Sequence, residues 1–173
     1  SRTKGGFSAS AGSRSLLSMT PDQIHLLRRS FARLEPHATV AALAFYRRLF
    51  ELAPQVRPLF KNDIESQSAK LMEMIGLAVS LTDRPAAMEG ELRDLGARHV
   101  NYGTRDEHYA VVGAALLDML AAVLGDEFTP ATKAAWTEFF GFISGKMLEG
   151  AAAARIDQVS AESCPTKLPN PGV

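Results

Sequence analysis

The chain has 173 residues and an apolar content of 46%, which fits one globular domain with a sizeable core. Nineteen basic residues balance nineteen acidic ones, so the composition does not favour binding to nucleic acid or to an anionic membrane surface. The single cysteine, Cys164, cannot form an internal disulfide. There is no unbroken apolar run near the length needed to span a bilayer, and the first residues lack the apolar core of a secretory signal. We therefore expect a cytoplasmic protein.

Composition divides the chain into three parts. Residues 1–18 are rich in Ser and Gly and precede a possible native start at Met19, so we expect a disordered extension or a remnant of expression cloning. Residues 19–155 are predicted to form one helical domain. Residues 156–173 contain three prolines near their end and are predicted to be a flexible tail.

The first half of the central part has clear helix signals. Thr20 as N-cap, Pro21 and Gln23 make a capping box that opens a helix, and Pro36 ends it. A second helix is expected over 37–52, with an inward stripe formed by Val40, Leu43, Tyr46, Leu49 and Phe50. Prolines at positions 54 and 58 predict a short helix that ends at Phe60.

The second half continues with helical periodicity. Helices are expected over 63–82, 86–102 and 106–124, with Gly103 and Gly125 closing the latter two, and Thr129-Pro130 opens the last one. Their inward stripes are Ile64, Gln67, Leu71, Ile75 and Ala78; Leu92, Leu95 and His99; Tyr109, Val112, Leu116, Leu120 and Val123; and Trp136, Phe139, Phe140, Ile143 and Met147. No strand-like alternation competes, so the sequence predicts an all-α fold with six main helices and one short helix.

Three polar side chains occupy stripes that otherwise read as apolar. A buried imidazole such as that of His99 needs a partner, so it is hydrogen-bonded, catalytic or a metal ligand. Gln67 and Tyr46 are the other two. The residues alone leave ordinary alternatives open for all three: a satisfied core histidine, a glutamine at the helix flank, and a tyrosine that caps a carbonyl. By contrast, His25, His37 and His108 are predicted at the surface.

Several segments occur in an order that resembles a known family. The stretch 45–60, the proximal-type segment 98–103 (RHVNYG), the stretch 108–113 (HYAVVG) and the helix opening at 128–136 are similar to those of bacterial haemoglobins. The likeness is strongest to single-domain globins related to flavohaemoglobins, of the Hell's Gate globin kind, where the run 66–72 (SQSAKLM) has a near match. The resemblance covers about residues 20–150 and implies a globin fold.

The resemblance also implies a haem b site. His99 would be the proximal iron ligand, and Tyr46 and Gln67 would be the distal residues that face a bound gas. Phe60 would be wedged against the haem and Leu71 would pack on its distal face. Lys70 would reach a propionate or remain solvated. The remaining residues expected to contact the haem are Leu95, Tyr109 and Val112.

The function implied by this resemblance is reversible binding of oxygen, for storage, delivery or sensing, with nitric oxide and carbon monoxide as further ligands. The alternative is a nitric oxide dioxygenase, an enzyme that would need a separate reductase, because the sequence contains no flavin or nicotinamide domain. A third class is a haem-free helical signalling domain of globin shape.

One position departs from the family pattern. In the flavohaemoglobin-related globins a Tyr and a Glu polarise the proximal histidine. Tyr109 matches that Tyr, but Ala151 stands at the Glu position and Glu149 lies two residues away. This departure argues against strong polarisation of His99 and against the peroxidase-like chemistry that such polarisation supports.

Overall fold

The computed structural model describes residues 18–162, so the predictions for residues 1–17 and 163–173 lie outside the described part. Within it the regular structure is helical, with no strand among the described residues. The α-helices are α1 (Pro21–Leu34), α2 (Ala38–Leu52), α3 (Ile64–Ser80), α4 (Pro85–Asn101), α5 (Asp106–Leu124) and α6 (Pro130–Glu162). The short helix η3 (Pro54–Leu59) joins α2 to α3, and single 3₁₀ turns lengthen three other connections. The predicted all-α class, with six main helices and one short helix, is confirmed.

The helix ends follow the local signals. The Thr20 hydroxyl accepts from the Gln23 amide at 3.2 Å while the Gln23 side chain accepts from the Thr20 amide at 2.9 Å, which completes the predicted capping box. The Asp63 carboxylate accepts from the Ser66 amide at 2.9 Å and caps α3. Gly103 and Gly125 follow α4 and α5 with φ of 82° and 53°, a conformation that glycine adopts at low cost.

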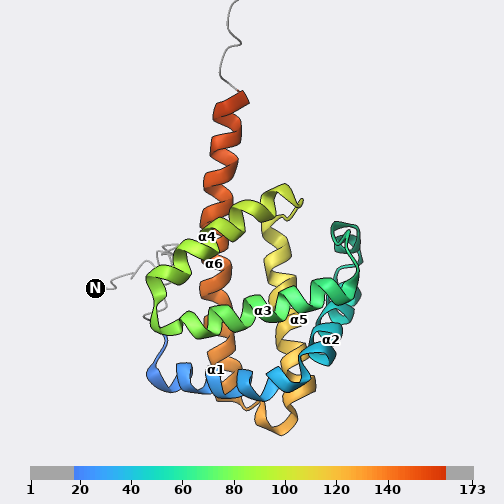
Figure 1. Ribbon diagram of the computed structural model, residues 1–173, viewed down its shortest axis with the longest axis vertical. Helices are drawn as coiled ribbons and strands as arrows, with labels where there is room; N and C mark the ends of the chain where they lie inside the picture. Colours follow the sequence, from blue (N-terminus) through green and yellow to red (C-terminus); the bar gives the residue numbers. More distant parts are fainter. Residues whose placement is uncertain (1–17, 163–173) are drawn as a thin grey trace, which may run out of the picture.

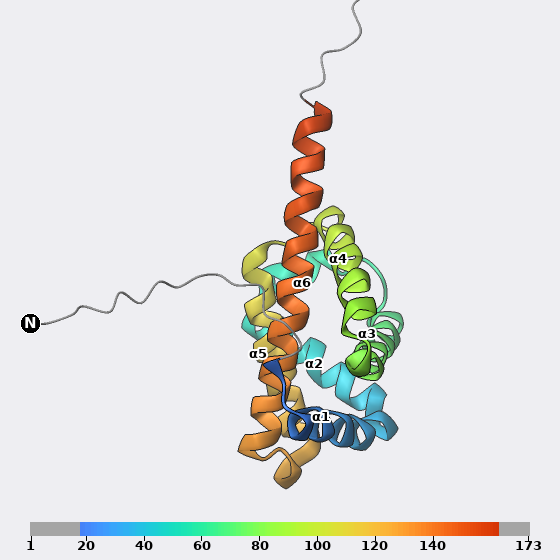
Figure 2. The ribbon, with the colours of Figure 1, turned by 90° about the vertical axis from the view of Figure 1, so that its left-hand side faces the viewer.

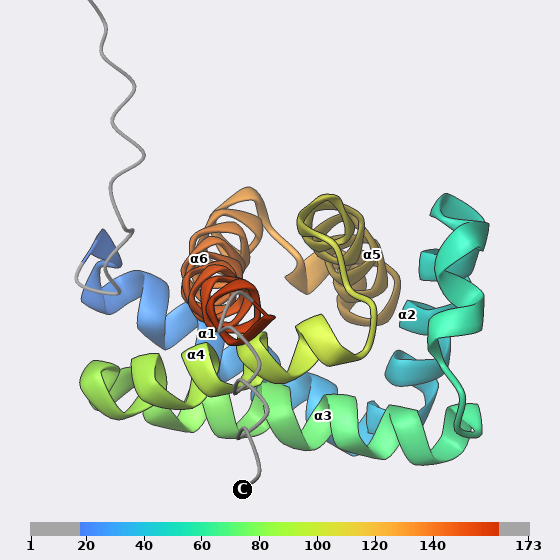
Figure 3. The same cartoon turned by 90° about the horizontal axis from the view of Figure 1, so that it is seen from above.

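The helices form two layers. Figure 3 shows α5 and α6 almost end-on and side by side, with α4 and α3 on one side of them. In Figure 1, α3 and α4 leave their connection at Leu81–Asp83 and diverge from it. The last turns of α6 extend beyond the other helices, as Figure 2 also shows. In this arrangement α4, which carries His99, packs against α6, whereas α3, which carries Gln67, packs mainly against α2 and also touches α1.

The core contains large side chains from every α-helix. Trp136 and Phe139 of α6 are fully buried, and the Trp136 indole N–H donates to the Ser30 hydroxyl at 2.8 Å. That hydroxyl donates in turn to the Leu26 carbonyl at 2.7 Å, so the polar groups of this buried contact are paired. The segment Asp106–Glu127 is apolar and long enough to cross a membrane, but many of its residues are buried in this core, which is typical of a central helix.

Two predictions from the stripes are wrong. Val40 and Leu43 are exposed, at 65% and 44%, because α2 buries the adjacent set Ala41, Ala42, Phe45, Tyr46 and Leu49. His108 was expected at the surface but is buried, because its Nδ1 accepts from the Arg105 amide at 3.1 Å and caps the start of α5. Both errors arise because burial depends on contacts outside the helix, which the periodicity of that helix alone cannot predict.

The last helix is longer than the predicted domain. α6 continues to Glu162, so the expected boundary at residue 155 falls inside a helix rather than at its end. The seven residues 156–162 are exposed. They lengthen α6, and Gln158 among them donates to the Asn101 side chain at the end of α4 across 3.4 Å.

Candidate functional site

His99 lies in the last turn of α4, where it is half-buried. Its Nδ1 lies 2.8 Å from the Leu95 carbonyl oxygen. Because a carbonyl can only accept, Nδ1 carries the proton and Nε2 keeps its lone pair. Burial lowers the pKa of His99 and nearby Arg98 lowers it further, while the Leu95 carbonyl opposes the shift. The side chain is therefore a neutral, oriented imidazole with a nitrogen that can bind a metal.

Tyr46 belongs to a cluster of four aromatic rings from α2 and the end of η3, in which the Phe45 ring centroid lies 5.1 Å from that of Tyr46. The Tyr46 ring centroid lies 6.0 Å from that of Phe50 and 5.3 Å from that of Phe60, and these two phenylalanine rings are 5.4 Å apart. Burial raises the pKa of Tyr46 to about 12, so its hydroxyl keeps its proton across the physiological range. The cluster holds a protonated phenol in an apolar surrounding.

The Tyr46 hydroxyl points toward α3. It donates to the backbone carbonyl of Gln67 across 3.4 Å, which is a long hydrogen bond. Gln67 itself is half-buried, as is Leu71 one turn later, whereas Lys70 is exposed. The structure thus brings together the two residues that were expected on the distal side. They belong to different helices and lie 21 positions apart in the sequence.

On the α5 side of the candidate site, the main polar group is a buried hydroxyl. Tyr109 is buried and its hydroxyl has no hydrogen-bond partner among residues 18–162. Burial raises the pKa of Tyr109, with a further rise from Asp106 that Arg155 opposes. Val112 and, on α4, Leu95 are partly buried and pack against the core. Ala151, at the position where the family pattern has Glu, is buried at 2% exposure.

Phe50 is a site residue that the sequence analysis missed. It was placed on the inward stripe of α2 without a role, yet its ring completes the cluster around Tyr46. The Arg57 guanidinium lies 5.1 Å from the centroid of the same ring and donates to the Phe60 carbonyl at 3.3 Å. The only signal was its spacing, four residues after Tyr46, which places both side chains on one face of the helix.

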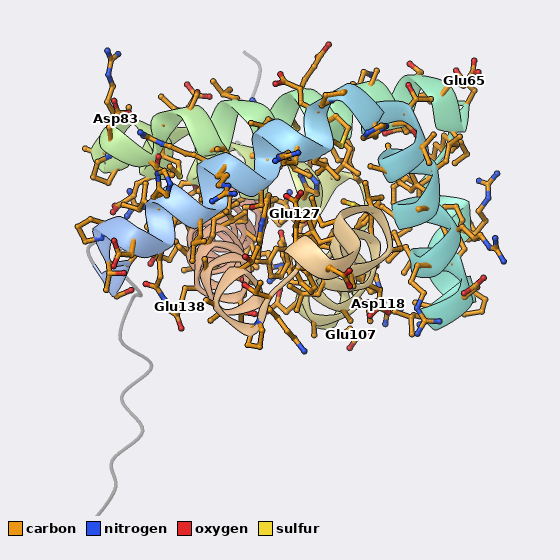
Figure 4. The ribbon with its side chains drawn as sticks, turned by 90° about the horizontal axis from the view of Figure 1, so that it is seen from below. Glu65, Asp83, Glu107, Asp118, Glu127 and Glu138 are labelled. Atoms are coloured by element: carbon orange, nitrogen blue, oxygen red, sulfur yellow. The ribbon has the colours of Figure 1, made fainter. Side chains whose placement is uncertain are left out.

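No group of three or more His, Cys, Asp or Glu side chains that could hold a metal ion occurs within the described residues. Glu65, Asp83 and Glu107 illustrate the distribution of carboxylates, since they project outward at the edge of the molecule in Figure 4. A metal bound by His99 would therefore depend on ligands from another molecule, such as the four nitrogens of a porphyrin.

Comparison with known proteins places the chain in a family. The globin family model matches residues 43–147, well over half of the chain. A flavohemoprotein of Vibrio cholerae is 25% identical over 146 residues, which are 83% of this chain and 37% of that protein. The anaerobic nitrite reductase NSHB5 of Oryza sativa subsp. indica is 29% identical over 133 residues, covering 73% of this chain and 92% of its own length. The chain thus spans about a third of the flavohemoprotein and nearly all of the plant protein.

Solved structures agree with this result. An engineered carbene transferase, built on a Rhodothermus marinus protein named as a nitric oxide dioxygenase, superposes with a TM-score of 0.73 at 27% identity, covering 83% of this chain and 99% of its own. A bacterial globin from Campylobacter jejuni has the same fold, with a TM-score of 0.70 at 24% identity and coverage of 79% and 99%. The chain belongs to the globin family and is a haem-binding globin related to the globin part of flavohaemoglobins.

Proposed function

We propose that the chain binds oxygen reversibly on a haem b whose iron is held by His99. The observation that carries this proposal is the half-buried neutral imidazole with its Nδ1 bonded to Leu95, together with the lack of other metal-binding clusters among residues 18–162. A haem with one imidazole ligand supplies an open coordination position for a diatomic gas. His99 contributes the Nε2 lone pair and holds the ring at a defined angle through its bond to the backbone.

The distal residues give this site its selectivity for a polar gas. The Tyr46 hydroxyl is protonated, buried and occupied only by a long bond to the Gln67 carbonyl, so it can turn to a better acceptor. The Gln67 side chain offers an amide with two N–H donors. Both groups can donate to oxygen, which accepts such bonds better than carbon monoxide does. Oxygen release would be slowed as a result.

The apolar residues around these groups would hold the porphyrin. We assign contact with the haem to Phe60, Leu71, Leu95 and Val112, which are partly buried and pack at the border of the core. Lys70 is exposed, so we assign it to a propionate at the solvent edge. Tyr109 would lie on the proximal side, where its buried hydroxyl has no partner among the described residues.

Nitric oxide dioxygenase activity is the second candidate function. It is favoured by the similarity to the Rhodothermus marinus protein, which this chain matches over 99% of that protein's length. The same three polar residues would bind the gases, but turnover consumes electrons that a reductase would have to supply. A cytoplasmic location suits either function and stays a prediction.

Absorption spectra of the purified full chain test the proposal. We expect a Soret band that shifts between ferric, ferrous and oxygenated forms, and pyridine extraction that releases haem b. A protein that takes up no haem would contradict both functions and favour the haem-free signalling class. Mixing the oxygenated form with nitric oxide in a stopped-flow instrument, with and without a reductase, separates simple oxygen binding from repeated enzymatic turnover.

A further inference from the structure

The backbones of α4 and α6 touch at two glycines. A Cβ atom added to Gly96 would lie 2.6 Å from the carbonyl carbon of Met147 and closer still to its oxygen. A Cβ atom added to Gly150 would lie 2.6 Å from the carbonyl carbon of Arg93, again with the oxygen closer. Gly96 thus lies against the α6 backbone one turn before Gly150, and Gly150 lies against the α4 backbone one turn before Gly96. We call this reciprocal contact, formed by residues 93–96 and 147–150, the glycine clasp.

Ion pairs surround the clasp. Arg93 donates to Glu149 at 3.0 Å and to Glu89 at 3.1 Å, so it bridges the two helices beside Gly96. Lys146, only 5% exposed, lies 3.1 Å from Glu149 and 3.7 Å from Glu89. Because two carboxylates and two cations alternate between α4 and α6, these pairs hold the register in which the glycines meet.

The clasp lies directly next to the site. Gly96 precedes His99 by three residues on the same helix, and the Leu95 carbonyl that orients His99 is adjacent to Gly96. In Figure 2, α4 and α3, the helix that carries Gln67, lie on the same side of α6. Any group that separates α4 from α6 therefore displaces the helix that carries His99.

We propose that the Gly96–Gly150 clasp is a positioning device that sets the place of His99 relative to the haem. This inference rests on the proposed role of His99 as the iron ligand. Helix backbones in direct contact cannot yield to an added methyl group through a side-chain rotation, so the helix itself must shift. A rigid α4 then transmits the shift to the imidazole one turn away.

The test uses Gly150→Ala and Gly96→Ala in the full chain loaded with haem. Gly145→Ala on α6 and Gly90→Ala on α4 are matched controls, because a Cβ at either position meets nothing within 4 Å. Glu149→Gln is a third variant that weakens the ion pairs without adding volume. The readouts are the iron–histidine stretching band of the ferrous form by resonance Raman, the rate of haem loss to a scavenging protein, and the far-UV CD melt of the haem-free chain.

We expect the clasp variants to shift the iron–histidine band and to lose haem about tenfold faster or more, while both controls match the parent. In a His99→Gly background supplied with free imidazole, Gly150→Ala should leave the band unchanged, because that imidazole is not attached to α4. If Gly150→Ala or Gly96→Ala proves unable to fold, the band of Glu149→Gln decides the question. An unaltered band in every variant that loads haem would overturn the proposal, even where melting temperatures fall.

Failure of the proposed function would look different. If His99 is not the iron ligand, His99→Gly keeps the parental band without added imidazole. That result would show that the clasp has no iron ligand to position, so the spectrum of His99→Gly is measured first. If the iron–histidine band disappears in His99→Gly but is unaltered in the clasp variants, His99 is the iron ligand and only the proposed role of the clasp is refuted.

Discussion

Replacing Tyr46 with Phe removes one hydroxyl and keeps the aromatic cluster. The ring packs against Phe50 and Phe60, so the substitution leaves no cavity. The bond that is lost in the ligand-free protein is the long one to the Gln67 carbonyl, at 3.4 Å. We therefore expect the free energy of unfolding of the haem-free chain to change by less than about 1 kcal/mol.

The effect on oxygen should be much larger. A hydrogen bond to an acceptor that carries charge contributes about 1.5–3 kcal/mol. Its loss predicts oxygen release that is about tenfold to a hundredfold faster, while carbon monoxide release changes much less. Gln67→Leu should act in the same direction. The double variant should show less than the product of the two effects, because both donors share one acceptor.

Stopped-flow displacement of oxygen by excess carbon monoxide measures oxygen release, and displacement of carbon monoxide by excess nitric oxide measures carbon monoxide release. Tyr102→Phe is the control, because its hydroxyl belongs to an exposed side chain at the end of α4. Oxygen release within twofold of the parent in both Tyr46→Phe and Gln67→Leu would refute the distal assignment. An equal acceleration for both gases would show that pocket access changed rather than hydrogen bonding.

Three further predictions concern the ligand, the core and the chain ends. His99→Gly should lose haem unless imidazole is added, whereas His25→Gln should keep a parental Soret band. Ser30→Ala leaves the buried indole N–H without its acceptor and should lower the free energy of unfolding in urea by about 1–3 kcal/mol, against a negligible change for the exposed Ser80→Ala. A chain of residues 19–155 should keep haem and melt within a few degrees of the full chain; a large fall in melting temperature would show that the ends contribute to stability.

Most of the fold could be predicted because its signals are local. Capping residues, prolines and the glycines after α4 and α5 mark helix ends through interactions within one turn of the chain. The buried face of α2 could not be predicted in the same way. Residues 40–46 are apolar on nearly every side, so more than one stripe fits, and the choice of the alanine face depends on the neighbouring helices.

In the site too, some features could be predicted from the sequence, whereas others depend on contacts between distant helices. The resemblance to globins predicts that Tyr46 and Gln67 face a bound gas; the structure joins the Tyr46 hydroxyl to the Gln67 backbone carbonyl, and the role of the two side chains stays a prediction. The glycine clasp was not visible in the sequence, because Gly96 and Gly150 are ordinary helix-interior glycines until the distant backbone that touches each is known. A contact between two helices far apart in the chain leaves no periodic pattern on either of them.

The proximal side of the candidate site bears on one kind of chemistry, the peroxidase-like cleavage of an O–O bond. A carboxylate that accepts from the proximal imidazole would increase its electron donation, which favours cleavage of an O–O bond. Here the recorded acceptor of the His99 Nδ1 proton is the neutral Leu95 carbonyl. Ala151 has no carboxylate, and Glu149 is bound by Lys146 and Arg93. The Tyr109 hydroxyl also lacks a partner among the described residues, so none of these groups adds negative charge to His99. The arrangement argues against peroxidase-like chemistry and leaves both reversible oxygen binding and nitric oxide dioxygenation as proposals.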